Sequence, residues 1–283
     1  MERSSAFPPN RSISLPTRLH PTSLRVEAEL NKLREWAIKS CCSSETLTSD
    51  NIQTGLVGLS EVYRCVEELV YSSRIQHGKL LEDALDHSVK LLDACGIIKD
   101  TQQKMKEQAI CLQLTLGRSG KESRFEDEIS SYLRLRSKLK KEASSCIRSL
   151  KRSERKFVAL PSSKDYNSEM VMKIFRELNL MTSRVLRSLL VFLSSPKVIK
   201  NTRNGCSLVS KLWPTKKMKK TVSEVGSVDD ALFCVLHGNE DMTMAHRKLE
   251  HLVISLGSIE AGLDVVFRRL IRYRVSILNV LTR

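Results

Sequence analysis

Several features common in enzymes and metal-binding proteins are missing from this 283-residue sequence. Its eight cysteines include no CxxC pair, so neither a disulfide scaffold nor a zinc site is indicated, and a reducing compartment is expected. There is no P-loop, GxGxxG, GxSxG or HExxH motif, and the six histidines form no metal-binding spacing. We therefore expect a protein that is not an enzyme and that binds no cofactor or metal.

Long apolar runs and aromatic residues are also scarce. No apolar run reaches the roughly 18–20 residues that cross a bilayer, and the nearest, residues 178–193, is interrupted by Arg184 and Arg187. Aromatic residues make up 5% of the chain and do not alternate with basic ones, so stacking on single-stranded nucleic acid is poorly supported. The 41% hydrophobic content, with 11 Gly and 7 Pro, still favours a globular protein over a disordered one.

The strongest positive feature is a heptad pattern over residues 240–283. Apolar residues recur at a spacing of seven, and a second set follows three residues later, which places both along one stripe of a long helix, as in coiled coils and bundles. Val253, Phe267 and Leu281 widen the stripe, which favours a globular bundle. Either the rest of the chain or a partner must cover it. The predicted core or partner positions are Leu249, Leu252, Leu256, Ile259, Leu263, Val266, Leu270 and Ile277, and Met242, Ala245, Tyr273 and Val280 complete the pattern.

Amphipathic patterns predict further helices along most of the chain, and no turn signals indicate hairpin strands. The predicted fold class is therefore all-α, an elongated multi-helix bundle with long amphipathic helices. The helices are expected from just after Pro21, from Asp50 with capping-box spacing to Gln53, from about Lys79 to Leu116 with an interruption or a kink near Gly96, from Glu122, from Asn167 to Pro196, from about Val228 to Leu236, and over the heptad region.

The first residues differ in composition from the rest. Residues 1–21 contain four prolines and three arginines, with Glu2 as the one acid, and predict an extended arm. This composition also suits an organellar transit peptide, although the prolines disfavour the amphipathic helix that such peptides form. We expect residues 22–283 to form a single all-α domain with a mobile basic loop at about 195–226.

Positive charge is concentrated in the second half of the chain. The net charge is +15, and residues up to Gly120 hold 15 basic and 15 acidic residues against 32 and 17 afterwards. Residues 178–223 hold ten basic residues and no acid, which suits contact with anionic lipid, with nucleic-acid phosphates, or a solvated linker. A second run, from Arg134 to Lys156, is expected to form the polar face of its helix. The candidate contacts with an anionic surface are Lys211, Trp213, Lys216, Lys217, Lys219 and Lys220.

Three passages carry a resemblance to a known family. They are RSISLPTRLHP (Arg11 to Pro21), LLDACGIIKD (Leu91 to Asp100) and IEAGLDVVFRRLIRYRVSILNVLT (Ile259 to Thr282). In order and spacing they resemble the plant-specific domain of unknown function related to the BYPASS proteins. The resemblance implies an intracellular, mainly helical plant protein linked to root and shoot development, and it brings no catalytic residues with it.

Together these observations predict a non-enzymatic helical interaction or scaffold protein with protein partners. We expect it in the cytoplasm, with peripheral contact to an anionic membrane as a further expectation. The alternative is a basic, nucleic-acid-associated regulatory protein, although no recognition-helix module is apparent.

Overall fold

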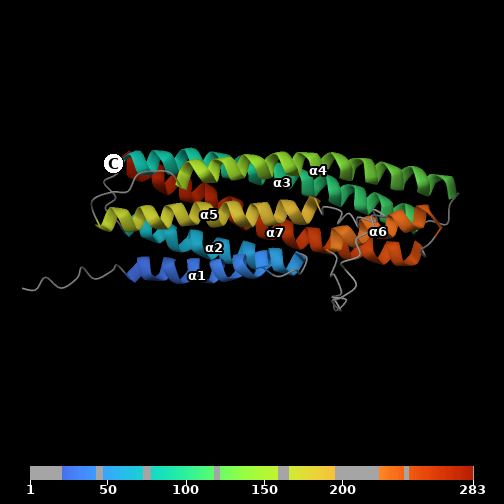
Figure 1. The fold of residues 1–283 in the computed structure, drawn as a ribbon, viewed down its shortest axis with the longest axis horizontal. Helices are drawn as coiled ribbons and strands as arrows, with labels where there is room; N and C mark the ends of the chain where they lie inside the picture. Colours follow the sequence, from blue (N-terminus) through green and yellow to red (C-terminus); the bar gives the residue numbers. More distant parts are fainter. Residues whose placement is uncertain are drawn as a thin grey trace, which may run out of the picture.

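The computed structural model describes residues 21–42, 47–72, 78–117, 122–158, 166–194, 223–238 and 242–282. Within these ranges the chain forms seven α-helices and no strand, which confirms the predicted all-α fold. The helices run along one long axis, so the molecule is an elongated bundle (Figure 1). Their bounds are α1 Pro21–Cys42, α2 Ser49–Ser72, α3 Gly78–Leu116, α4 Glu122–Val158, α5 Tyr166–Ser194, α6 Glu224–Leu236 and α7 Met242–Leu281.

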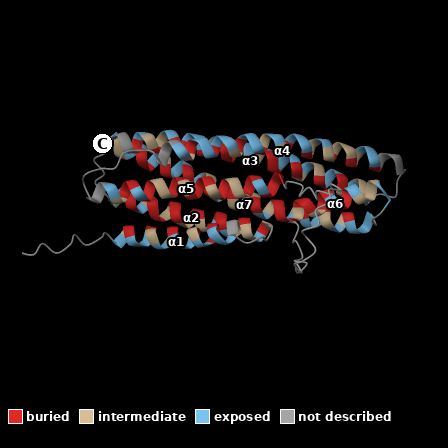
Figure 2. Cartoon of the chain, in the orientation of Figure 1, coloured by how far each residue is buried: buried red, intermediate tan, exposed pale blue. Residues whose placement is uncertain are grey.

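Two helices occupy the centre of the bundle. α5 packs against α1, α2, α3 and α4, whereas α7 packs against α2, α3 and α6. Buried residues lie on the sides of the helices that face their neighbours (Figure 2). α4 contacts α3 and α5, with a smaller contact to α6, and one long side of this helix stays exposed.

The heptad stripe of α7 lies inside the bundle except at its ends, where Met242 is exposed and Val280 is half-buried. All eight positions predicted as core or partner contacts are fully buried. Tyr273, from the same stripe, meets the ring of Tyr63 on α2 edge-to-face at 5.6 Å and that of Phe175 on α5 at 5.8 Å. Burying one large aliphatic side chain is worth about 1.5–3 kcal/mol, so this stripe contributes much of the cohesion of the bundle. The helices of the same chain are what cover it.

Polar side chains in the core connect particular helices. The hydroxyl of Thr182 on α5 donates to the carbonyl of Leu178 at 2.7 Å, so it accepts from the hydroxyl of Tyr63 on α2, 2.9 Å away. Burial raises the pKa of Tyr63, which keeps this donor protonated. The side-chain amide of Gln102 on α3 donates to the backbone carbonyl of Leu256 on α7. These bonds set the register of α2 on α5 and of α3 on α7.

α1 and α2 approach each other closely at Gly55. A Cβ atom there would lie 2.5 Å from Cζ2 of the Trp36 ring, closer than two such atoms can approach. The indole N–H of Trp36 donates to the carbonyl of Asn51 at 2.8 Å. Because Gly55 has no side chain, the Trp36 indole can pack directly against the backbone of α2.

The predicted interruption near Gly96 is wrong. α3 continues through this residue from Gly78 to Leu116. A glycine inside a helix costs about 1 kcal/mol relative to alanine. The buried neighbours Ala94, Cys95 and Ile98 pack into the core on both sides of it, and this packing outweighs that cost.

Two predicted helix starts are also corrected. At the start of α2, the hydroxyl of Thr48 accepts from the backbone N–H of Asn51 at 3.3 Å, and Asp50 lies within the first turn instead of capping it. α6 begins at Glu224, before the predicted Val228, because the hydroxyl of Ser223 accepts from the backbone N–H of Gly226 at 3.2 Å. Residues 223–226 thus belong to α6 and its cap, not to a loop.

Candidate interaction surface

The basic segment singled out from the sequence lies outside the described residues, as does the arm before Pro21. This segment holds the predicted contacts Lys211, Trp213, Lys216, Lys217, Lys219 and Lys220. The described part of the chain carries a different basic surface, on α4.

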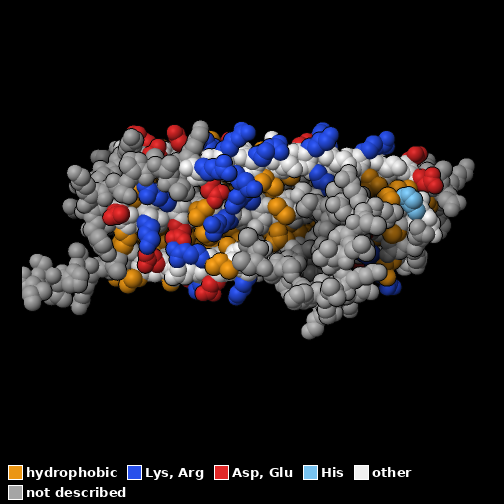
Figure 3. Space-filling view, viewed as in Figure 1, with side chains coloured by type: hydrophobic (Ala, Val, Ile, Leu, Met, Phe, Trp, Pro, Cys, Tyr) orange, Lys and Arg blue, Asp and Glu red, His pale blue; other side chains and the backbone are white. Residues whose placement is uncertain are grey.

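The exposed residues of α4 between Arg134 and Arg155 are all basic or serine. Six of the basic residues are spaced by three, four or seven positions, which aligns them along one side of the helix. At about 1.5 Å per residue, this row is about 32 Å long. Lys and Arg side chains follow the edge that α4 forms (Figure 3). We define the α4 basic face as Arg134, Lys138, Lys141, Arg148, Lys151, Arg152 and Arg155.

No residue of the α4 basic face forms an ion pair with another described residue. The two acids in this stretch, Glu142 and Glu154, are half-buried, and Glu154 pairs with Arg187 of α5 at 3.3 Å. Like charges three or four positions apart destabilise a helix by about 0.2–0.5 kcal/mol per pair. The folded chain therefore bears a repulsion that binding of an anion would relieve.

The helices beside α4 differ in charge. α5 adds the exposed Lys173 and the half-buried Arg184, neither of which forms an ion pair with a described residue. On the other side, α3 exposes Asp93, Asp100 and Glu107 at a spacing of seven, which aligns these acids on one face of that helix. α3 also exposes Lys90 and Lys104 beside these acids, so its side is mixed in charge, whereas the positive surface extends from α4 toward α5.

Arg136 contradicts the prediction that the basic run from Arg134 to Lys156 is entirely a polar face. This residue is 1% exposed. Its Nε and Nη2 donate to Oδ1 and Oδ2 of Asp229 on α6 at 2.9 and 3.1 Å. Nη1 also donates to the carbonyl of Leu193 at 2.5 Å, and Nη2 to that of Ser194 at 3.3 Å.

The sequence held a signal for this buried arginine. Arg136 stands four residues after Tyr132 and three before Leu139, so it occupies an inward position of the α4 apolar pattern. Burial is tolerated because the guanidinium meets a carboxylate and two carbonyls at the C-terminal end of α5, where the helix dipole is negative. One side chain of α4 thereby contacts both the end of α5 and Asp229 of α6.

Two neighbours complete this buried cluster. Nζ of Lys140 donates to Oδ2 of Asp229 at 3.1 Å. Burial, and then the charge of Asp229, raise the pKa of Tyr132, so its hydroxyl stays protonated. The cluster thus stabilises the contact between α4 and α6 and exposes no reactive group.

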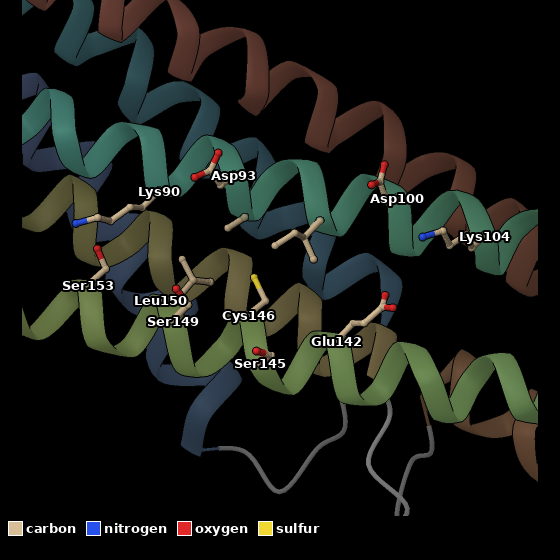
Figure 4. A pocket seen from close by; sticks show the side chains of 12 residues that line it. Lys90, Asp93, Asp100, Lys104, Glu142, Ser145, Cys146, Ser149, Leu150 and Ser153 are labelled. Carbon is tan, nitrogen blue, oxygen red and sulfur yellow. The ribbon is translucent and has the colours of Figure 1, made fainter.

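A groove of about 480 Å³ lies between α3 and α4 (Figure 4). Its charged residues are of both signs, with Lys90, Asp93, Asp100 and Lys104 from α3 and Glu142 from α4. The α4 side is formed by small polar residues, and Cys146 and Leu150 lie buried between the two helices. The mixed charge favours neither an anionic nor a cationic ligand.

At one end of the groove, Oγ of Ser153 lies 2.9 Å from Nδ1 of His87. Both residues are buried, at 6% and 3% exposed. In serine hydrolases the serine meets Nε2 and the acid meets Nδ1, so this contact has the opposite arrangement. Burial, and then the charge of Lys90, lower the pKa of His87 to about 4, and the imidazole is neutral at pH 7.

The free thiols among the described residues include Cys65, Cys95, Cys111, Cys146 and Cys234. Cys95 and Cys146 are buried free thiols, and burial raises the pKa of Cys95 to about 12 and that of Cys146 above its usual value. Among the described residues, no group of three or more His, Cys, Asp and Glu is arranged to hold a metal ion. None of the helices within the described ranges combines the length and apolarity needed to cross a bilayer.

Comparison with known families shows which family the chain belongs to. A family model described as "Protein BPS1" matches residues 55–280, from the second turn of α2 to the end of α7. The chain belongs to the BPS1 family. Membership confirms the resemblance to the BYPASS-related proteins seen in the sequence. No curated protein and no solved structure gives a significant match. The BPS1-family region includes both the α4 basic face and the Arg136–Asp229 pair.

Proposed function

We propose that this BPS1-family protein is a non-enzymatic, intracellular helical interaction protein that binds an anionic partner through the α4 basic face. The BYPASS resemblance implies a link to root and shoot development, and we propose that this binding serves that role. The observation that carries the proposal is the row of exposed cations on α4, none of which is paired with another described residue.

The surroundings of this row support a binding role. A bundle packed on the α7 stripe and joined by Arg136 holds α4 as a straight, supported helix. Cations on a fixed helix lose little conformational freedom of the backbone on binding, which favours association. Charge of one sign also accelerates encounter with an opposite charge.

Proximity labelling in plant root cells tests the proposal. The full chain is compared with Arg148→Gln/Arg152→Gln, which removes two charges from the α4 basic face. The matched control is Arg268→Gln/Arg272→Gln, because those exposed arginines have the same spacing on α7. We expect the α4 variant to lose neighbours that the control and the unchanged chain share. Identical neighbours and identical rescue of root and shoot growth in all three would contradict an interaction role for α4.

A further inference from the structure

We propose that the anionic partner of the α4 basic face is the surface of a lipid bilayer, on which α4 and the adjoining side of α5 lie flat. This inference rests on the proposed function, since it uses the same cations and adds the identity and orientation of what they bind.

The shape of the surface favours a bilayer. α4 packs alongside α5, and two helices packed side by side, about 8–10 Å apart, present a broad, nearly flat surface. Basic side chains appear over both helices in one view (Figure 3). Lipid headgroups move laterally, so they can adapt to any spacing of cations along the row. A plane of mobile negative charge therefore suits a flat face about 32 Å long.

The side chains on this face are poorly suited to recognise nucleic-acid bases. From Arg134 to Arg155 the exposed residues include no aromatic side chain for stacking and no Asn or Gln for contacts with base edges. α4 is also packed along its sides by α3 and α5, so it cannot enter a major groove as an isolated recognition helix does. What remains is attraction to negative charge without sequence recognition.

The charges on the helices beside α4 favour one orientation. α3 exposes Lys90 and Lys104 among the acids Asp93, Asp100 and Glu107, so its side carries no net positive charge, whereas Lys173 and Arg184 of α5 would be attracted to anionic headgroups. The molecule therefore tilts toward α5 and away from α3. The outer side of α7, with the exposed Ile254 and Val275, is not part of this contact and stays available to other partners.

Vesicle sedimentation with the full chain tests the inference. The vesicles contain equal parts of phosphatidylserine and phosphatidylcholine, and pure phosphatidylcholine serves as the neutral surface. Each basic residue near an anionic bilayer contributes roughly a fivefold gain in affinity, so Arg148→Gln/Arg152→Gln is expected to bind about 25-fold more weakly. Arg268→Gln/Arg272→Gln should bind within about twofold of the unchanged chain. Binding should weaken steeply above about 0.15 M salt, where the Debye length is about 8 Å.

Each of the following results would overturn the lipid assignment. The first is equal binding to neutral and acidic vesicles, and the second is equal loss in the α4 and α7 variants. The third is displacement from acidic vesicles by duplex DNA at matched phosphate concentration, with the α4 variant losing affinity for that DNA, which would assign the face to nucleic acid. If vesicles fail to bind while proximity labelling still depends on α4, the lipid assignment fails and the interaction function stands.

Discussion

The guanidinium of Arg136 on α4 and the carboxylate of Asp229 on α6 form a two-point ion pair inside the bundle, with Nε–Oδ1 and Nη2–Oδ2 distances of 2.9 and 3.1 Å. The two residues are 93 positions apart in the chain. Their contact joins the helix that carries the basic face to the short helix that packs on α7. The same arginine also holds the last carbonyls of α5.

Removing one partner of this pair is expected to destabilise the fold strongly. Asp229→Ala leaves a buried guanidinium without its carboxylate, a change that typically costs about 3–5 kcal/mol. Urea unfolding measures the loss. The matched control is Asp230→Ala, because Asp230 is the next residue in the chain and its carboxylate is exposed. This change should cost less than about 0.5 kcal/mol. Equal effects of the two substitutions would mean that the pair contributes nothing.

The buried stripe of α7 makes a second prediction. Leu263 is fully buried, so Leu263→Ala should lower the free energy of unfolding by about 2–5 kcal/mol through lost burial and the cavity left behind. Ile254→Ala on the same helix is the control because Ile254 is 65% exposed. The melting temperatures of both variants are compared with that of the unchanged chain. A melting temperature unchanged by Leu263→Ala would show that this position does not support the core.

His87 predicts a loss of stability in mild acid. Burial lowers its pKa in the folded state to about 4, whereas an unfolded histidine has a pKa of about 6.5. The contribution of His87 to the free energy of unfolding is therefore complete above pH about 6.5. It is lost as the pH falls toward 4, because the unfolded chain binds a proton that the folded chain excludes. At pH 5 the loss is about 2 kcal/mol.

This pH effect is measured by urea unfolding at pH 7.5 and pH 5 for the unchanged chain and His87→Gln. The other titrating groups are common to both proteins, so the difference between the two pH dependences isolates His87. We expect the variant to lose less stability in acid. Parallel pH dependences would refute the assignment.

Gly55 predicts a steric effect that Gly96 lacks. Gly55→Ala places a methyl group 2.5 Å from the Trp36 ring, and such overpacking typically costs about 1–3 kcal/mol. At Gly96 a Cβ atom meets nothing within 4 Å, so Gly96→Ala should stabilise α3 by up to about 1 kcal/mol. Opposite shifts in the urea midpoint are the expected result. A stabilising Gly55→Ala would mean that Trp36 moves aside without cost.

Local patterns in the sequence were sufficient to predict the helices and the inward side of α7. Spacings of three, four and seven depend on helix geometry alone, so Leu256, Leu263 and Leu270 could be aligned before any partner helix was known. Boundaries were less predictable where a tertiary contact intervenes. At the start of α2, for example, the carboxylate of Glu224 from α6 accepts from the backbone N–H of Ser49 at 2.9 Å.

The sequence by itself determined that the chain is basic, helical and organised on a heptad stripe. Only the tertiary structure decided which partner an inward-facing charge meets. Arg134 and Arg136 are two residues apart, yet the first is exposed on the α4 basic face and the second is buried against Asp229. Residues two apart on a helix point in different directions. Whether a charge is costly or stabilising in a given direction depends on what another part of the chain places there.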